Sequence, residues 1–315
     1  MTRFPAAFLA CWMALPTGAQ TPVSGLSDAD YAAACRAEVG PLPDFSCADG
    51  VPVPITVDGA PVSDYIPQMT CDRPSLLDNG PDSDGQCVPY SRILNLSNDR
   101  MMVSVMCRQR VIRGAASLEF DEIDVIAHNP ASGATCWFQA SGSRSRPVDG
   151  RQVPSPTGTQ AAGFWNPPLE VLNGGCGNCH DNDPFMYSPF VGQVWDRVPQ
   201  APFGPYFHVD PGLGFDAWPT ATFDLRDNTC LGCHRIGRDQ TCASLTAWMT
   251  GERTPAGADA AALRYPLSHA MPPGYGQTLE SWVNVYADSV RQIRSCCADP
   301  DQPSCALTPI PRGHP

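Results

Sequence analysis

Two short segments of the sequence share one pattern: a cysteine, two other residues, a second cysteine and a histidine. They are Cys176-Gly177-Asn178-Cys179-His180 and Cys230-Leu231-Gly232-Cys233-His234. Residues three and four positions apart lie on the same face of a helical turn. Each segment is therefore predicted to form one helical turn that presents two thiols and an imidazole side by side. The rest of the chain must fold around both groups.

This spacing is the attachment signature of a c-type haem. The two thiols can bond the two vinyl groups along one edge of a porphyrin, and the imidazole is then the proximal ligand of the iron. A redox dithiol, a paired zinc site and structural cysteines are the competing interpretations. Two matches in a chain with six histidines favour two haem c groups. The predicted haem-binding residues are Cys176, Cys179, His180, Cys230, Cys233 and His234.

The beginning of the chain has the features of an export signal. Arg3 precedes a mostly apolar run over residues 4–15, which is too short to cross a bilayer, and small residues precede a cut at Gln20. A lipoprotein cut before Cys11 is the rival interpretation. No later stretch is long and apolar enough to span a membrane. We therefore expect residues 1–19 to be removed and the mature protein to be periplasmic or secreted.

The cysteine count agrees with export to an oxidising compartment. Of the 15 cysteines, Cys11 lies in the leader and four belong to the two motifs. The remaining ten can form up to five disulfides, although the sequence does not fix their pairing. We expect Cys296 and Cys297 to bond to different partners, because a bond between adjacent cysteines is strained. The ten are Cys35, Cys47, Cys71, Cys87, Cys107, Cys136, Cys242, Cys296, Cys297 and Cys305.

The charge of the chain restricts its partners. The formal net charge is −12, and all 20 positive side chains are arginines, with no lysine. An acidic surface of this kind argues against nucleic acid and against anionic membranes as partners. It predicts redox partner proteins that are basic or of mixed charge rather than acidic.

The sequence predicts an α+β protein with two domains. Residues 20–140 should form a small disulfide-rich domain that contains β-strands, with six of the ten cysteines and short alternating or apolar runs separated by turn signals. Residues 141–163, rich in Ser, Gly, Pro and Arg, are expected to be a linker or long loop. Residues 164–315 carry both motifs and should be loop-rich and mainly helical. The expected strands lie within residues 92–96, 101–106, 118–120, 123–127 and 135–138.

Helix signals are strongest near both ends of the chain. Ser27 resembles a helix cap that is followed by acidic residues, so a short helix should follow it. In the C-terminal half we expect the two haem-binding turns, a helix over residues 239–249 and the best-defined helix over residues 278–295. Many aromatic side chains between residues 165 and 248 could wall the edges of the haems.

The acidic segment around Asp78, Asp82 and Asp84 is a weak calcium candidate. Its acids alternate ahead of a glycine, as they do in calcium loops, but the full EF-hand pattern is absent and a plain solvated loop is the alternative. His128 follows an apolar run and is interpreted as a strand-end histidine. No nucleophile motif, P-loop or dinucleotide fingerprint occurs in the N-terminal half.

The sixth ligand of each iron decides what the haems can do, and Met and His are the usual choices. Met271, followed by two prolines that stiffen the segment, is a candidate for the second haem, and His269 is its rival two positions away. For the first haem the candidates are His208, His269 and Met186. Arg235 and Arg238 follow the second motif and could pair with haem propionates, with solvated charges as the alternative. The predicted iron ligands, proximal and distal, are His180, His234, Met271, His269 and His208.

With these residues in view, the C-terminal half resembles the dihaem c-type cytochromes of bacterial periplasms. The resemblance rests on the two motifs and on the Met-Pro-Pro segment, and the N-terminal half resembles no family. It implies an electron-transfer protein with two covalently attached haems rather than a catalyst. The alternative is a dihaem peroxidase-like oxidoreductase in which one iron keeps an open position. A third possibility gives the N-terminal half a binding or structural role, with the haems as its redox tether.

Overall fold

The computed structural model describes residues 27–77, 79–80, 82–159, 161, 163–201, 203–250, 252, 263–268, 271 and 278–313. It is a mixed α+β protein with one large sheet, three two-stranded sheets and helices that include α1 (Asp28–Glu38) at the start of the described chain and α6 (Leu279–Ala298) before its last strand. The predicted α+β class is confirmed at this level. The predicted leader lies outside the described residues, and within them no helix is long and apolar enough to cross a membrane.

The large sheet has six strands in the order β1-β4-β5-β7-β8-β10. All neighbours are antiparallel except β10, which runs parallel to β8 and comes from the C-terminal half of the chain. The sheet therefore joins segments on both sides of residues 141–163. Its strands are β1 (Val51–Pro52), β4 (Arg92–Asn95), β5 (Met102–Arg108), β7 (Glu122–His128), β8 (Ala134–Ser141) and β10 (Phe207–His208).

The central strands form because β-branched and other apolar residues alternate with more polar ones. In β5 and β7 the buried positions recur at every second residue, as expected of strands with one fully covered face. Val103, Val105, Ile123 and Val125 are at most 1% exposed and belong to one apolar core. The predicted strands in this region are confirmed, including His128 as the last residue of β7.

Helix α1 (Asp28–Glu38) packs against the sheet. It begins at the predicted cap, where Ser27 and Asp30 form a reciprocal capping box. The disulfide Cys35–Cys136 bonds it to β8, and the Tyr31 hydroxyl accepts a hydrogen bond from the backbone amide of Trp137. The helix is therefore held on the sheet by both a covalent bond and a buried hydrogen bond.

All ten cysteines outside the motifs and the leader form disulfides, as the sequence predicts. Three bonds lie in the N-terminal half and two in the C-terminal half, and Cys296 and Cys297 have different partners. Such a disulfide content is typical of proteins outside the cytoplasm. The bonds are Cys35–Cys136, Cys47–Cys107, Cys71–Cys87, Cys242–Cys297 and Cys296–Cys305.

The remaining strands form three two-stranded sheets. Residues 141–163 contain β9 and then run back across the N-terminal half, where Val153 forms a β-bridge with Phe45 and the Ser155 hydroxyl donates to the Leu42 carbonyl. The strand pairs are β2 (Thr56–Val57) with β3 (Ala60–Pro61), β6 (Glu119–Phe120) with β9 (Val148–Asp149), and β11 (Ala221–Asp224) with β12 (Ala306–Pro309).

The remaining helices belong to the C-terminal half. They are α2 (Pro168–Gly174), α3 (Cys176–Cys179), α4 (Ala247–Met249) and α6 (Leu279–Ala298). Helix α6 is the predicted helix, and the Thr278 side chain caps it through the amide of Ser281. A π-helical turn over Thr241–Thr246 continues into α4, close to the predicted helix over residues 239–249.

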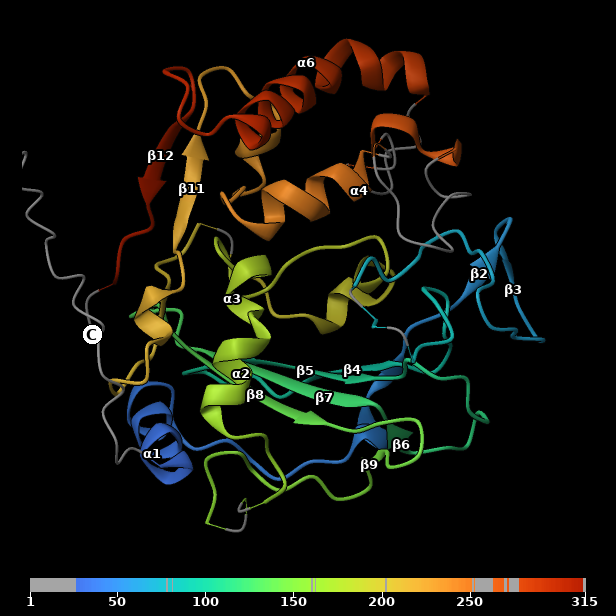
Figure 1. Cartoon of the computed structure of the whole chain (residues 1–315), viewed down its shortest axis with the longest axis vertical. Coiled ribbons are helices and arrows are strands. Elements are labelled where there is room, and N and C mark those ends of the chain that lie inside the picture. The colour runs from blue at the N-terminus through green and yellow to red at the C-terminus, as the bar shows by residue number, and fades with distance from the viewer. Residues whose placement is uncertain are drawn as a thin grey trace, which may run out of the picture.

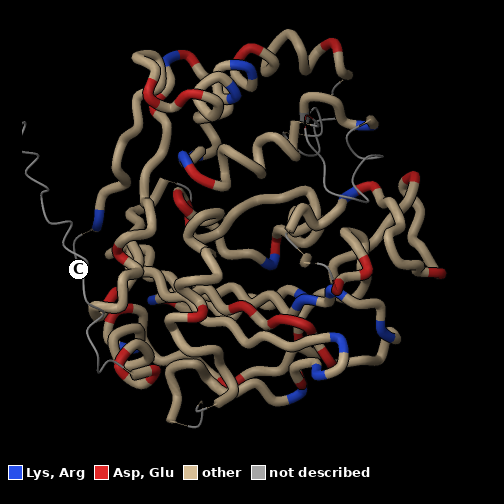
Figure 2. The backbone as a smooth tube through the Cα atoms, in the orientation of Figure 1, with Lys and Arg blue, Asp and Glu red and all other residues tan. Residues whose placement is uncertain are grey.

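The arrangement in space places the first motif over the large sheet. Helices α2 and α3 stand above the sheet, whereas α6 and the β11–β12 pair lie at the far end of the molecule (Figure 1). The apolar core of the sheet continues into this half through Val171, Phe215, Trp218 and Ile310. Acidic and basic positions are interspersed along the described backbone rather than gathered at one end (Figure 2).

Candidate haem-binding site

The first motif forms the predicted helical turn. Gly175, in the left-handed conformation with φ 72°, separates α2 from α3, and the His180 amide donates to the Cys176 carbonyl at 2.9 Å. Burial raises the pKa of the Cys176 thiol to about 12, with the negative charges of Asp124 and Glu122 adding to the effect. The thiol is thus protonated and lies against the sheet.

His180 is held in an orientation and protonation state that suit a metal ligand. Its ring lies against the indole of Trp137, with centroids 4.8 Å apart, and its Nδ1 is 3.3 Å from the Asp183 carbonyl oxygen. Burial lowers the pKa of His180 to about 4, so the ring is neutral. A histidine that donates its Nδ1 proton to a carbonyl keeps a lone pair on Nε2, which is the usual arrangement of metal-bound histidines.

The sheet adds two further buried histidines to the first site. In the strand register His128 of β7 and His208 of β10 both pair with Thr135 of β8, so the three side chains share one face, together with Trp137 two residues along. His128 and His208 are 0% and 3% exposed. Burial lowers the pKa of His128 to about 4 and that of His208 to about 3. The predicted candidate His208 therefore lies in the neighbourhood of His180, and a positive charge on either ring would disfavour a positive charge on the other.

The second motif begins with a 3₁₀ turn over Cys230–Gly232 and is anchored to α6. The His234 amide donates to the Cys230 carbonyl at 3.0 Å, which closes the turn that carries the two cysteines and the histidine. Asn228 Oδ1 accepts a hydrogen bond from the backbone amide of Cys230. The side-chain NH₂ group of Asn228 donates a hydrogen bond to the Ser289 carbonyl of α6. Burial lowers the pKa of His234, so this imidazole is neutral as well.

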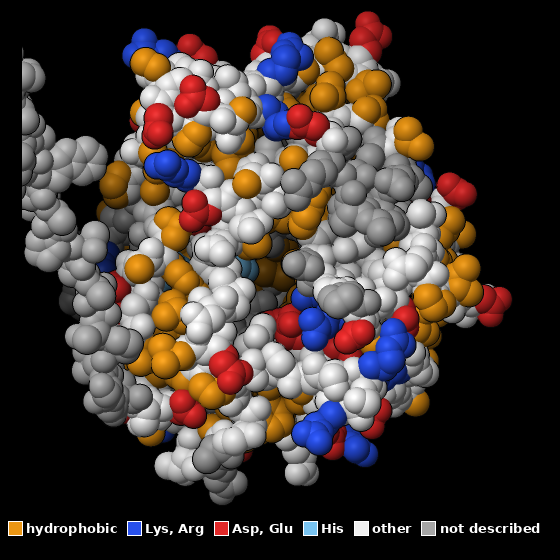
Figure 3. All heavy atoms as spheres, viewed as in Figure 1, with side chains coloured by type: hydrophobic (Ala, Val, Ile, Leu, Met, Phe, Trp, Pro, Cys, Tyr) orange, Lys and Arg blue, Asp and Glu red, His pale blue; other side chains and the backbone are white. Residues whose placement is uncertain are grey.

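A cavity of about 640 Å³ adjoins the second motif. This volume lies within the range of pockets that hold small-molecule ligands and cofactors. Independently of this cavity, the face of the molecule drawn in Figure 3 has a hollow near its centre, in which hydrophobic side chains and a histidine that the figure does not label are visible. The walls of the cavity come from the motif, from β11 and from the segments around them. They include Leu231, Gly232, His234, Arg235, Phe203 and Phe223.

The predicted distal segment of the second site is described only at Met271. The Met271 carbonyl accepts a hydrogen bond from the Trp282 indole of α6 at 2.7 Å. Trp282 belongs to a small apolar cluster against which Cys230 packs, so Met271 and the second motif are both attached to α6. His269 and both prolines after Met271 lie outside the described residues. The assignment of Met271 or His269 as a ligand therefore stays a prediction.

The two motifs are joined by contacts between the residues that follow them. Arg235 and Asp183 form an ion pair at 3.3 Å, with side chains 8% and 20% exposed. Asn182 donates to the Arg235 carbonyl at 2.6 Å. Gly237 is needed here, because a β-carbon would collide with the carboxylate of Asp181. The two candidate haem sites are thus neighbours.

Asp181 strengthens this junction. Its carboxylate accepts hydrogen bonds from the Thr241 hydroxyl at 2.6 Å and from the Asp239 amide at 2.7 Å. Thr241 Oγ1 also lies 2.9 Å from the Cys179 carbonyl of the first motif. Burial raises the pKa of Asp181 to about 7 despite the hydrogen bonds that favour its charged form.

The two candidate propionate partners differ in environment. Arg235 is buried, pairs with Asp183 and lies over the Phe203 ring, 5.7 Å from its centroid. Arg238 is half exposed and 3.8 Å from the exposed Asp301. The alternative interpretation of Arg235 as a charge exposed to solvent is therefore wrong. The residue lines the cavity beside His234.

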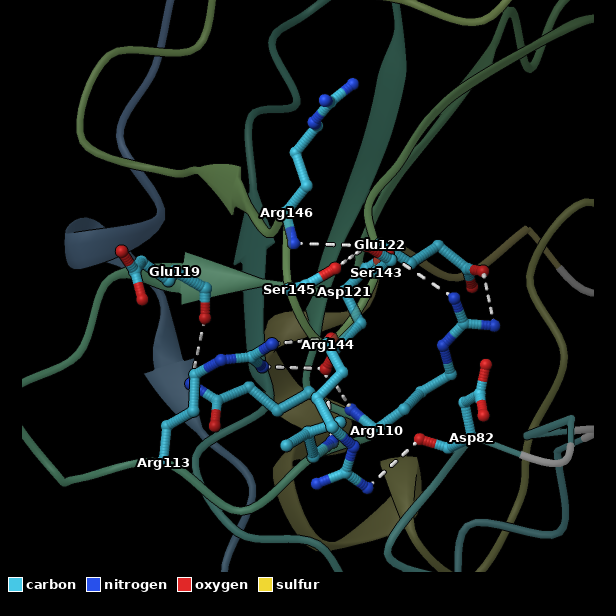
Figure 4. Close-up of polar contacts among 12 residues, drawn as sticks. Asp82, Arg110, Arg113, Glu119, Asp121, Glu122, Ser143, Arg144, Ser145 and Arg146 are labelled. Atoms are coloured by element: carbon cyan, nitrogen blue, oxygen red, sulfur yellow. Dashed lines mark hydrogen bonds and ion pairs between the residues drawn. The ribbon is translucent and has the colours of Figure 1, made fainter.

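The carboxylate of Asp84 at the calcium candidate already has partners. Asp84 accepts hydrogen bonds from Arg144 at 2.7 Å and from the Ile112 amide at 2.8 Å, and the Asp82 carbonyl accepts from Arg144. Figure 4 shows Arg144 between this loop and the neighbouring strands. Asp78 lies outside the described residues. In the part of the chain that is described, no group of three or more His, Cys, Asp or Glu side chains could hold a metal ion.

Asp121, in the same polar cluster, has partners on both oxygens of its carboxylate. Its carboxylate forms an ion pair with both terminal nitrogens of Arg113 and accepts hydrogen bonds from the backbone amides of Arg110 and Val111 (Figure 4). Burial alone would raise the pKa of Asp121, but these hydrogen bonds hold it below its usual value. The charged carboxylate therefore stabilises the fold.

Replacing Asp121 by asparagine should lower the free energy of unfolding by about 2 kcal/mol at pH 7, the magnitude of hydrogen bonds to a charged group. Because the pKa is lower in the folded state, the stabilisation is complete above about pH 4, the pKa of an unfolded aspartate, and is lost as the pH falls through the folded-state value. Urea unfolding of the wild type and the variant at pH 7 measures the loss of stability, and the same experiment below pH 4 measures how this loss depends on pH. Asp149→Asn, which removes an exposed pair with Arg151, should cost less than about 0.5 kcal/mol. An equal loss of unfolding free energy in Asp121→Asn and Asp149→Asn would contradict the stabilising role of the charged Asp121 carboxylate.

Comparison with known proteins adds no relative. No protein-family model, no curated protein and no solved structure matches this chain. The function must therefore be argued from the residues themselves.

The site residues that the sequence did not single out are Thr135 and Trp137, which orient the buried histidines through side-chain hydrogen bonds. Their positions in a short apolar run were the only available signal.

Proposed function

We propose that this protein is an exported dihaem c-type cytochrome, periplasmic or secreted, that carries electrons between redox partners through two covalently attached haems. One observation carries the proposal. Ten cysteines form disulfides, whereas the four cysteines of the two motifs retain their thiols, each pair next to a half-buried neutral histidine. Thiols kept out of disulfides in such a protein are available for thioether bonds.

The residues present fit a haem at both motifs. Cys176, Cys179 and His180 would hold the first haem, where buried unpartnered histidine nitrogens lie close by. Cys230, Cys233 and His234 would hold the second, beside the cavity that His234 lines. A bound haem supplies a reversible one-electron carrier whose potential depends on its axial ligands and surroundings.

The chain itself would hold the two carriers close together and shield them. The pair Arg235–Asp183 and the hydrogen bonds around Asp181 fix the segments that follow the two motifs against each other. The net charge of −12 favours a basic or mixed-charge partner for electron exchange.

A dihaem peroxidase-like oxidoreductase is the second candidate. The cavity beside His234 favours it, because an open position at the second iron would need such space. Electron transfer predicts that both ferric irons are six-coordinate and low-spin and that neither reacts with peroxide. Absorption and electron paramagnetic resonance spectra of the purified protein, with and without peroxide, test this. A high-spin ferric haem that reacts with peroxide would replace the electron-transfer proposal by the peroxidase one.

A further inference from the structure

Two buried histidines of the first site each have one ring nitrogen without a hydrogen-bond partner. They are His128 and His208, and the nitrogen is Nε2 in both. Only four buried side-chain nitrogen or oxygen atoms of the described residues lack a partner, so two such atoms in one site are notable. Buried polar atoms are nearly always satisfied, and an exception often marks a functional group or an absent ligand.

His128 lies close to the first motif in space, although it is 52 positions before His180. Its ring meets the Phe185 ring edge-on, with centroids 6.0 Å apart, and lies 6.5 Å from the Tyr206 ring. The Tyr206 hydroxyl in turn donates to the His180 carbonyl at 2.6 Å. The side chain of His128 therefore belongs to the wall of the first site.

The Thr135 hydroxyl supplies an acceptor for a proton on Nδ1 of His128. Thr135 Oγ1 lies 3.1 Å from the Gly133 carbonyl, to which it can donate, and 2.9 Å from Nδ1 of His128. When the hydroxyl donates to this carbonyl, it accepts from His128, and the proton of the neutral ring is on Nδ1. Nε2 is then a buried lone pair without a donor, which is the form of imidazole that binds iron.

His208 has the opposite arrangement. The indole Nε1 of Trp137 can only donate, and it donates to Nδ1 of His208 at 2.9 Å. The neutral His208 ring therefore carries its proton on Nε2. This nitrogen could bind iron only after it lost its proton and the ring became an anion.

We propose that His128, rather than His208, is the distal axial ligand of the haem at the first motif. The inference rests on the proposed dihaem function. Nε2 of His128 has no hydrogen-bond partner. In the tautomer with the proton on Nδ1, this nitrogen offers its lone pair and Thr135 holds the ring by accepting the other N–H, as outer partners of metal-bound histidines do. The N-terminal half would then supply an iron ligand from the end of β7.

The test compares His128→Gln with the matched variant His208→Gln, both at buried histidines of the same site. Haem content by the pyridine haemochrome assay must first equal that of the wild type. In His128→Gln, one of the two ferric haems should change from low-spin to high-spin in the electron paramagnetic resonance spectrum, and added imidazole should restore the low-spin signal. His208→Gln should keep the wild-type spectrum. A low-spin spectrum in His128→Gln, or a high-spin haem in His208→Gln alone, would overturn the assignment.

A milder variant covers the case in which His128→Gln does not fold. Thr135→Val keeps the shape of the side chain but removes the acceptor for the Nδ1 proton, which should make the imidazole a weaker electron donor. The midpoint potential of one haem should rise with haem content unchanged, and unchanged potentials for both haems would refute the ligand role. A wild-type chain without covalent haem would instead refute the proposed function, so the two failures are distinguishable.

Discussion

Replacing Cys176 and Cys179 together by alanine should remove one of two covalent haems from each chain. Both thioether bonds of the first site would be lost, while the second motif, closed by its own turn and anchored to α6, would keep its haem. The pyridine haemochrome assay on protein exported from cells that attach c-type haem should fall from two haems per chain to one. The double variant of Cys230 and Cys233 should give the same result.

The control for this experiment removes two cysteines without touching a motif. Cys71 and Cys87 form a disulfide that closes a short loop in the N-terminal half. Their double alanine variant should keep both haems, even though loss of such a bond typically costs about 3 kcal/mol. If either motif variant retained two haems, or the control lost them, the four cysteines would not be the attachment points.

Removing Arg235 should destabilise the junction between the two motifs. Arg235→Ala would leave the buried carboxylate of Asp183 without its cation, and breaking a buried ion pair from one side costs about 3–5 kcal/mol. Burial already raises the pKa of Asp183 to about 7, and Arg235 opposes this. Urea unfolding of the haem-loaded protein at pH 8 measures the loss.

Two further variants separate the ion pair from a general effect of losing an arginine. Arg238→Ala, at a half-exposed site 3.8 Å from Asp301, should change the free energy of unfolding by less than about 0.5 kcal/mol. Adding Asp183→Asn to Arg235→Ala should recover part of the loss, because no buried charge is then left uncompensated. Equal effects of Arg235→Ala and Arg238→Ala would contradict the proposed junction.

Much of the fold follows from local signals in the sequence. Ser27 and Asp30 mark the start of α1, and the alternation in residues 101–106 and 123–127 marks β5 and β7. The set of ten disulfide cysteines follows from setting aside the motif cysteines and the leader. These features depend on capping, on the strand period of two and on counting, all of which are visible without tertiary structure.

The arrangement of the first site depends on contacts that the sequence does not display. Strand β10 has only two residues and pairs with β8, which lies more than 70 residues earlier in the sequence. No local sequence pattern therefore predicts it. His208 was a candidate ligand because of its apolar setting, yet the hydrogen bond from Trp137 sets its tautomer. His128 was interpreted as a strand-end histidine, which it is, and only the Thr135 contact shows its available nitrogen.

Helix α6 illustrates the same boundary between local and tertiary information. The helical spacing of its apolar residues predicts the helix, and Trp282 and Ile293 are buried as expected. Leu279 and Val283 fit the same period but are each 41% exposed. Periodicity identifies which residues share a face, whereas the neighbours that cover this face are set by tertiary packing.

The most direct test of the central claim is the mass of the exported chain under denaturing conditions with its disulfides reduced. Non-covalent groups are lost under these conditions, whereas thioether-bound haem remains. The account predicts the mass of the polypeptide, less its leader, plus two haems. A mass equal to that of the polypeptide alone, or with a single haem, would contradict it.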